Sequence, residues 1–274
     1  SNNKRLITFG LFLILIGLIK KIVFADSISP YIDQCFEKLP KTINAAWLGA
    51  ALYSFQVYFD FSGYSDIAIG SAYILGFRLP INFDAPYLSF SPSQFWQRWH
   101  ISLSYWIRDY IYIPLGGSKG SFFKNAFVII LTMSIAGIWH GRNLNFLYWG
   151  FLWGVYILLG RIIKFKNNFY GLVWLFHIFV VLMLWVLFRS PDFNYAFSYW
   201  KIMIGFKSTL PIEFNESLSN NLNNSSLSLL FWFLITFFFS LHWIESRMKG
   251  IKYILFLRKF SSLTVNSFLI TISI

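Results

Sequence analysis

The chain has 274 residues, of which 57% are hydrophobic, 22% aromatic and 12% charged. Soluble domains contain about 45–50% apolar and about 25% charged residues, so this composition excludes an ordinary soluble domain. The net charge is +12, and because the basic residues stand singly or in pairs between apolar blocks, they indicate a membrane surface and exclude a nucleic acid as the partner.

The apolar residues form blocks long enough to cross a bilayer. A spanning helix needs about 20 mostly apolar residues. The predicted spans are 6–24, 44–62, 126–141, 145–163, 171–188 and 228–245, with a seventh segment, 251–274, that is interrupted by Arg258 and Lys259. The sequence therefore predicts an all-α, polytopic transmembrane protein, with 1–274 as a single membrane domain.

Two further segments are apolar but carry too many polar residues to span. Residues 63–79 contain three glycines, Asp66 and Arg78, and residues 93–113 contain two glutamines, a histidine, two arginines and an aspartate. Such segments are tolerated at membrane depth only against protein or a wet cavity. We expect both to be interfacial or re-entrant helices around a polar tunnel.

The distribution of basic residues predicts an orientation. Lys and Arg concentrate in 78–124, 161–166 and 247–259, whereas 208–227 has none and is rich in Asn and Ser. By the positive-inside rule, the three basic segments are cytoplasmic and the Asn/Ser-rich loop faces outward.

The polar segment 90–110 is the first candidate for chemistry. If it forms one helix, Gln97, His100, Ser104 and Arg108 share a face, and aromatic side chains cover most of the remainder. Polar groups inside a membrane are costly and mark functional sites. An interfacial helix that anchors at the headgroups through Trp and Arg explains the segment equally well.

His140 is the second candidate. It ends an uncharged apolar run, between Gly137 and Gly141 and close to Asn143 and Asn145. A histidine titrates near neutral pH and is the usual proton acceptor in catalysis. The glycines leave room for a close backbone or ligand approach, although a hydrogen-bonded packing histidine is the alternative.

The remaining polar features favour structural roles. His177 and His242 lie among apolar residues and are interpreted as packing histidines, the glycine-rich run 114–120 as a plain turn, and Asp60 as the partner of an arginine. The four histidines and the one cysteine, Cys35, give no metal-ligand spacing.

Several runs of this sequence together resemble the membrane-bound O-acyltransferase (MBOAT) family. These runs are Tyr58–Asp66, Gly76–Pro80, Asn82-Phe83, Pro86-Tyr87, Phe95–Ser104, Trp106–Tyr110, Ile113–Gly117, Trp139-His140-Gly141 and Trp149-Gly150. The series covers 53–155, which we interpret as the catalytic core. A teichoic acid D-alanylating branch shares the Arg-Trp-His and Arg-Asp-Tyr elements, but Pro114–Gly117 favours the alginate O-acetylase branch.

The resemblance implies a fold and a set of roles. His140 matches the family's essential histidine and His100 its second conserved histidine, with Gln97, Ser104, Arg108 and Asn143 expected to bind substrate. A tunnel would bring an acyl thioester such as acetyl-CoA from the cytoplasm to a hydroxyl acceptor from outside, with no bound cofactor. Family members carry further membrane helices before this region, so the chain is expected to be the C-terminal portion of a longer protein.

The resemblance also implies a function and partners. The leading hypothesis is an O-acetyltransferase of the bacterial inner membrane that acts on a cell-envelope polysaccharide, surrounded by membrane lipid and helped by an extracytoplasmic acyltransferase partner. The alternatives are D-alanyl transfer to teichoic acid, a non-enzymatic transporter or export component, and a structural subunit of an envelope complex.

Overall fold

The computed structural model describes residues 2–162, 170–206, 236, 239 and 240. These residues form helices, turns and one isolated bridge between Phe83 and Trp99, with no strand among them. In chain order the elements are α1 (Asn2–Leu18), η1 (Ile19–Asp26), α2 (Ser27–Glu37), α3 (Ile43–Ile74), η2 (Pro86–Leu88), α4 (Pro92–Arg98), α5 (Ile101–Ile107), η3 (Arg108–Tyr112), α6 (Phe122–Trp139), α7 (Leu144–Ile162), α8 (Tyr170–Arg189) and α9 (Phe193–Met203). The predicted all-α fold is confirmed.

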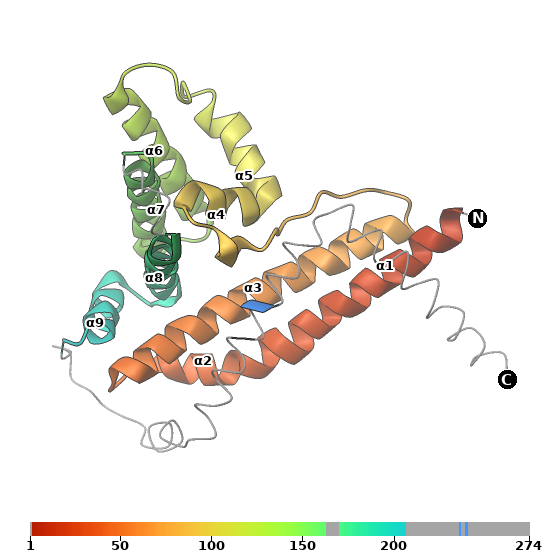
Figure 1. Cartoon of the computed structure of the whole chain (residues 1–274), viewed down its shortest axis with the longest axis horizontal. Coiled ribbons are helices and arrows are strands. Elements are labelled where there is room, and N and C mark those ends of the chain that lie inside the picture. The colour runs from red at the N-terminus through yellow and green to blue at the C-terminus, as the bar shows by residue number, and fades with distance from the viewer. Residues whose placement is uncertain (1, 163–169, 207–235, 237–238, 241–274) are drawn as a thin grey trace.

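The helices form two groups. Figure 1 shows α1 and α3 as one long antiparallel pair, with α4 to α8 gathered on one side of it.

Within the described residues, three helices are long and apolar enough to cross a membrane: Leu6–Glu37, Phe122–Trp139 and Tyr170–Arg189. The protein is therefore a membrane protein, as predicted.

The predicted segments 126–141, 145–163 and 171–188 correspond to α6, α7 and α8. The first helix continues beyond its predicted end at residue 24, through η1 into α2. The segments 228–245 and 251–274 lie outside the described residues, apart from isolated positions. Helix α9 was not predicted.

The expected separate helix over 63–79 is wrong, because α3 runs unbroken for 32 residues. Its glycines are the contact with α1: a Cβ on Gly17 would lie 2.5 Å from the Gly63 carbonyl oxygen, and a Cβ on Gly10 would lie 2.5 Å from that of Gly70. Both helices space these glycines seven residues apart, so the two backbones approach closely at every second turn. The glycines that suggested a break instead join the helix to its neighbour.

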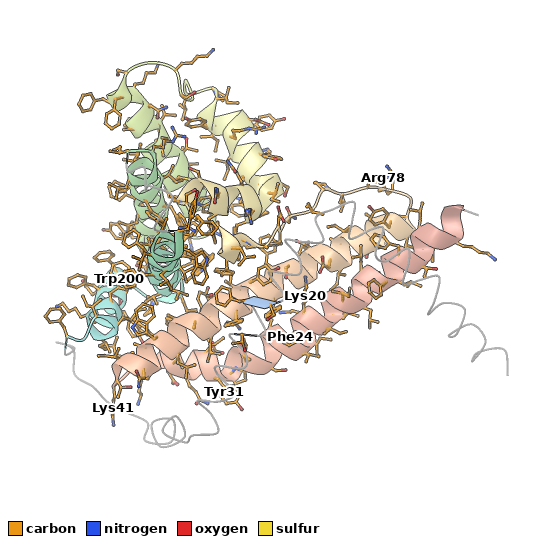
Figure 2. The ribbon with its side chains drawn as sticks, viewed as in Figure 1. Lys20, Phe24, Tyr31, Lys41, Arg78 and Trp200 are labelled. Carbon is orange, nitrogen blue, oxygen red and sulfur yellow. The ribbon has the colours of Figure 1, made fainter. Side chains whose placement is uncertain are left out.

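Ion pairs connect the charged residues along the contact between the first helix and α3. Lys20 bonds Asp66 at 2.8 Å, and Lys21 bonds Asp60 at 2.5 Å and Asp26 at 2.9 Å. Lys20 lies about midway along the α1–α3 pair (Figure 2). Asp60 therefore pairs with a lysine and not, as expected, with an arginine.

Glycine also sets the approach of α6 to α7. A Cβ on Gly137 would collide with the Phe146 carbonyl oxygen, and one on Gly150 with that of Met133. The two helices form a tight hairpin whose turn begins at His140. The fold thus places this histidine at one end of the hairpin.

Candidate active site

His140 caps the C-terminus of α6 and lies in a box of aromatic rings. Its backbone N–H bonds the Gly137 carbonyl at 3.0 Å. The imidazole is partly buried and lies 5.1 Å from the Phe188 ring and 5.3 Å from the Trp149 ring, centroid to centroid, nearly perpendicular to both. Three helices, α6, α7 and α8, therefore fix the position of this one side chain.

The glycines beside His140 make room for α7. A Cβ on Gly141 would lie 2.6 Å from the Phe146 ring, and Gly137 faces the Phe146 backbone. The prediction of a close backbone approach is confirmed for Gly137, whereas Gly141 faces a side chain, and the space at both glycines is filled by protein.

His100 lies at a sharp break between α4 and α5. Its backbone is left-handed, with φ +43° and ψ +57°. For a residue other than glycine this conformation costs about 1–2 kcal/mol. Its partly buried ring meets Phe61 of α3 edge to face, with 4.5 Å between centroids.

Asn82 holds this break in place. Its Oδ1 accepts hydrogen bonds from the Ser102 N–H at 3.2 Å and the Ser102 hydroxyl at 2.6 Å, and its carbonyl accepts from the Ile101 N–H at 3.1 Å. These bonds fix the first residues of α5 and so support the strained backbone of His100. No role for Asn82 was predicted, although Asn82-Phe83 is one of the runs that resemble the MBOAT family.

The two candidate histidines are coupled by charge. Burial and, to a smaller extent, a charge on His140 together lower the pKa of His100 to about 4, so the two imidazoles lie within electrostatic range of each other. His100 is therefore neutral at pH 7. In the described part of the chain, the ring nitrogens of both histidines make no hydrogen bond and are available to a ligand.

The predicted polar helix face is wrong. Because Trp99 is extended and His100 left-handed, α4 ends at Arg98 and α5 starts at Ile101, so Gln97, His100, Ser104 and Arg108 do not follow one helix. The bridge between Phe83 and Trp99, contributed by a loop well upstream, imposes the break.

The four expected substrate-binding residues have different surroundings. Gln97 is exposed. Ser104 donates its hydroxyl to the Trp99 carbonyl at 3.2 Å, and Arg108 pairs with Asp109 at 2.7 Å. The Asn143 side-chain amide donates to the Pro191 carbonyl at 2.5 Å, just before α9, and accepts from the Asn145 N–H of α7 at 3.2 Å. Its two ends thus connect α7 to the start of α9.

His177 is a structural residue, as predicted. It is 1% exposed, and its Nε2 lies 2.9 Å from Ser89 Oγ and its Nδ1 2.8 Å from Tyr156 Oη. Ser89 gives its single proton to the Pro86 carbonyl at 2.6 Å, so Nε2 must donate to Ser89 and Nδ1 must accept from Tyr156. One tautomer satisfies the whole chain of bonds. His242 lies outside the described residues.

A tryptophan cluster backs His140. Within the described residues the buried indole N–H groups of Trp96, Trp149 and Trp153 have no hydrogen-bond acceptor. The three rings meet pairwise at 74° to 78°, an arrangement in which ring edges face aromatic surfaces. Through Trp149, this cluster packs against the imidazole of His140.

The glycine-rich run is a turn, as predicted. Gly116, Gly117 and Gly120 have positive φ, and the Gly117 carbonyl accepts from the Asn125 amide at 2.8 Å.

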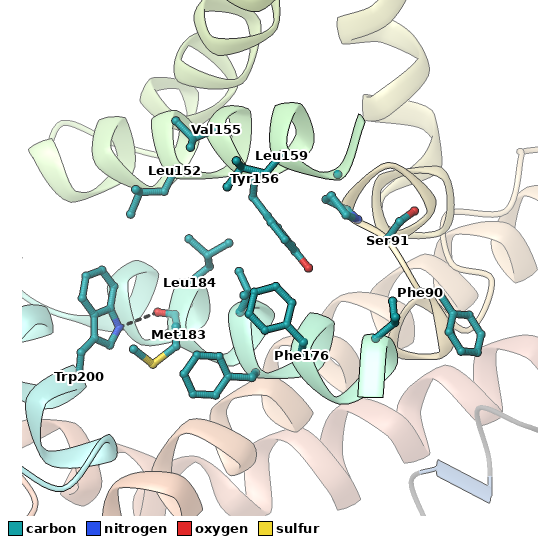
Figure 3. Close-up of a pocket in the computed structure, with 15 residues that line it drawn as sticks. Phe90, Ser91, Leu152, Val155, Tyr156, Leu159, Phe176, Met183, Leu184 and Trp200 are labelled. Atoms are coloured by element: carbon teal, nitrogen blue, oxygen red, sulfur yellow. Dashed lines mark hydrogen bonds between the residues drawn. The ribbon is translucent and has the colours of Figure 1, made fainter. Parts of the chain in front are cut away.

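A cavity of about 410 Å³ lies elsewhere, between α7 and α8 (Figure 3). Its lining is apolar and includes none of the six predicted site residues, so it is not the predicted polar tunnel.

Comparison with known proteins identifies the family. The sequence model of the membrane-bound O-acyltransferase (MBOAT) family matches residues 1–172, well over half of the chain. The chain belongs to the MBOAT family. The matched range includes the core 53–155 and both candidate histidines.

The curated relatives include proteins that are named as O-acetylases or O-acetyltransferases. It is 41% identical over 218 residues to the probable alginate O-acetylase AlgI of Azotobacter vinelandii, which covers 78% of this chain and 44% of that protein. It is 36% identical over 231 residues to the peptidoglycan O-acetyltransferase of Helicobacter pylori (81% and 43%). To the teichoic acid D-alanyltransferase of Bacillus subtilis it is 33% identical over 152 residues (52% and 38%). The chain thus spans less than half the length of these relatives.

Proposed function

We propose that this chain carries the reaction centre of a membrane O-acyltransferase that transfers an acetyl group from a thioester to a hydroxyl of a cell-envelope polysaccharide, or to a partner acyltransferase. Family membership and the names of the relatives support the reaction class. The observation that supports His140 is its environment. Three helices hold its ring among aromatic side chains, and within the described residues both ring nitrogens make no hydrogen bond.

In this proposal His140 is the general base. Its free nitrogen takes the proton of the acceptor hydroxyl while the oxygen attacks the thioester carbon. The new C–O bond forms, the C–S bond breaks, and the departing thiolate takes the proton from the imidazolium. The net result is one ester and one thiol. The aromatic box limits access of water, which would otherwise hydrolyse the thioester.

His100 is proposed to position the reactants. Its low pKa keeps it neutral, so it does not oppose the positive charge that forms on His140 during proton transfer. Gln97 can donate to the developing oxyanion from the end of α4. Asn143, Ser104 and Arg108 would have to leave their present partners to bind substrate.

The same hypothesis includes the acyl donor, the location of the protein and a partner. The donor is a cytoplasmic thioester such as acetyl-CoA, the protein crosses the bacterial inner membrane several times, and an extracytoplasmic partner completes the transfer. D-alanyl transfer to teichoic acid is the second candidate because two relatives carry that name. The match of the Bacillus subtilis protein covers 52% of this chain against 78% for the alginate relative, which favours acetyl transfer.

The test is His140→Ala in the full-length protein, in its own cells. General-base catalysis contributes about 10²–10⁴-fold, so ester-linked acetate released from the isolated envelope by mild base should fall at least 100-fold. Immunoblots of membranes should show unchanged protein. Lys38→Gln, a change at an exposed residue outside the aromatic box around His140, serves as the control.

Two results would contradict the proposal. Undiminished acetate with His140→Ala would remove the residue from the reaction. Ester-linked D-alanine in place of acetate would select the second candidate.

A further inference from the structure

No hydrogen bond orients the imidazole of His140. Neither ring nitrogen is bonded within the part of the chain that the structure describes. In many catalytic histidines, one nitrogen donates to a carboxylate or a carbonyl oxygen, and this bond decides which nitrogen faces the substrate. The torsion that turns an imidazole about its Cβ–Cγ bond has no sharp preference of its own. The orientation of this ring therefore depends on the side chains packed against it.

Phe188 of α8 contacts His140 and also two of its other aromatic neighbours. The centroid of its ring lies 5.1 Å from that of the imidazole, at an interplanar angle of 81°. It also lies 5.1 Å from the Trp149 ring and 5.0 Å from the Phe146 ring. Those two rings are themselves 5.3 Å and 6.2 Å from the imidazole. Loss of Phe188 would remove one wall beside the imidazole and loosen two others, so the imidazole could turn.

The end of α8 that carries Phe188 is fixed to two other helices. Arg189 and Ser190 follow Phe188 directly in the sequence. Asn145 of α7 is 2% exposed, and its Nδ2 donates to the Ser190 carbonyl at 2.7 Å, while Arg189 pairs with Asp33 of α2 at 2.7 Å. Because breaking the Asn145 bond would leave buried polar groups unpaired, this bond holds the end of α8, and Phe188 with it, beside His140.

We propose that Phe188 is a positioning residue for the proposed acyl transfer. Its ring keeps one nitrogen of His140 directed at the acceptor hydroxyl, and the hydrogen bond from Asn145 to Ser190 holds Phe188 in place. This role rests on the proposed function of His140 as the general base. Phe188 lies outside residues 1–172, which the MBOAT family model matches, so its contacts in the structure are the basis for the assignment.

The test measures how fast base-labile acyl esters accumulate in the envelope after induced expression of the full-length protein in its own cells. In Phe188→Ala the rate should fall about 10-fold to 100-fold, because a displacement of about 1 Å can cost a catalytic group about 100-fold. Phe188→Tyr keeps the ring and should retain most of the rate. Phe188→Leu fills a similar volume without a flat ring, so its rate should stay well below that of wild type.

Phe179→Ala is the matched control. Phe179 lies earlier on the same helix, is likewise partly buried, and packs against Trp47. Its replacement should leave the rate unchanged. All rates are compared per amount of folded protein, which immunoblots and melting curves of isolated membranes give for each variant.

Asn145→Ala tests the support of Phe188. It removes the bond to Ser190 and should slow the reaction by the same route. Because residues that act through one shared contact are not additive, the double variant Asn145→Ala/Phe188→Ala should be about as slow as Phe188→Ala alone. Losses that multiply in the double variant would overturn the role of this bond.

The positioning role and the proposed function fail in different ways. Wild-type rates in Phe188→Ala or Phe188→Leu, a Phe188→Tyr variant as slow as Phe188→Ala, or an equal loss in Phe179→Ala would overturn the positioning role even if His140→Ala is inactive. A wild-type rate in His140→Ala would overturn the proposed function, and the positioning role with it.

Discussion

At the residue scale, Asn82 is the support on which His100 depends. In Asn82→Ala the Ser102 N–H and hydroxyl lose their acceptor, at a cost of about 1–3 kcal/mol for a buried unpaired group, and the left-handed turn loosens. We expect a lower melting temperature in detergent and an acetylation rate reduced about tenfold. Asn82→Asp keeps the accepting oxygen and should restore most of both, so equal losses in the two variants would contradict this role.

His100 also makes stability depend on pH. Its pKa is about 4 in the folded protein against 6.5 for an unperturbed histidine, so the unfolded chain takes up a proton first as the pH falls. The stabilisation is complete above pH 6.5 and is lost progressively between pH 6.5 and 4. Melting curves should therefore show a smaller drop between pH 7 and 4.5 for His100→Gln than for wild type. Parallel drops would show that His100 is not the titrating group.

At the element scale, the seven-residue glycine spacing joins α1 to α3. Gly17→Ala places a methyl against the Gly63 carbonyl, and overpacking of this kind costs about 1–3 kcal/mol. Gly171→Ala on α8 meets nothing within 4 Å and should be neutral or gain up to about 1 kcal/mol in helix propensity. Thermal melting of the two variants checks the contrast. Equal melting temperatures would disprove close packing of the two helices.

The same helices show which parts of the fold could be predicted from the sequence. Helices α6, α7 and α8 were predictable because each is one largely apolar run, and α6 and α8 are also apolar enough to span a membrane. The continuity of α3 was not, since the meaning of Gly63 and Gly70 depends on the glycines of α1. The break at His100 was missed for a similar reason: the Asn82 and Phe83 contacts that impose it come from a preceding loop. His140 was predicted as a candidate from the sequence, but its aromatic neighbour Phe188 could not be, because it comes from a different helix.

At the scale of the whole molecule, the orientation of the α6–α7 hairpin is open to a direct test. The positive-inside rule predicts that residues 78–124 are cytoplasmic and that the turn after α6 faces outward. With Cys35 replaced by Ala, Arg142→Cys should react with a membrane-impermeant maleimide in intact cells, after outer-membrane permeabilisation if the host has one. Lys119→Cys should react only once the inner membrane is opened. The reverse pattern would invert the proposed topology.

The chain of bonds from Ser89 through His177 to Tyr156 ties η2, α8 and α7 together, and its polarity limits what can replace the histidine. The central side chain must donate at one end and accept at the other. Glutamine is the other common side chain with a donor and an acceptor of this reach, so saturation mutagenesis at position 177 should recover His and Gln and few other residues. At position 140, where the proposed task is to accept and then release a proton, Gln should be as inactive as Ala. The set of residues tolerated at each position thus distinguishes a histidine that holds a fixed hydrogen bond from one that carries a proton.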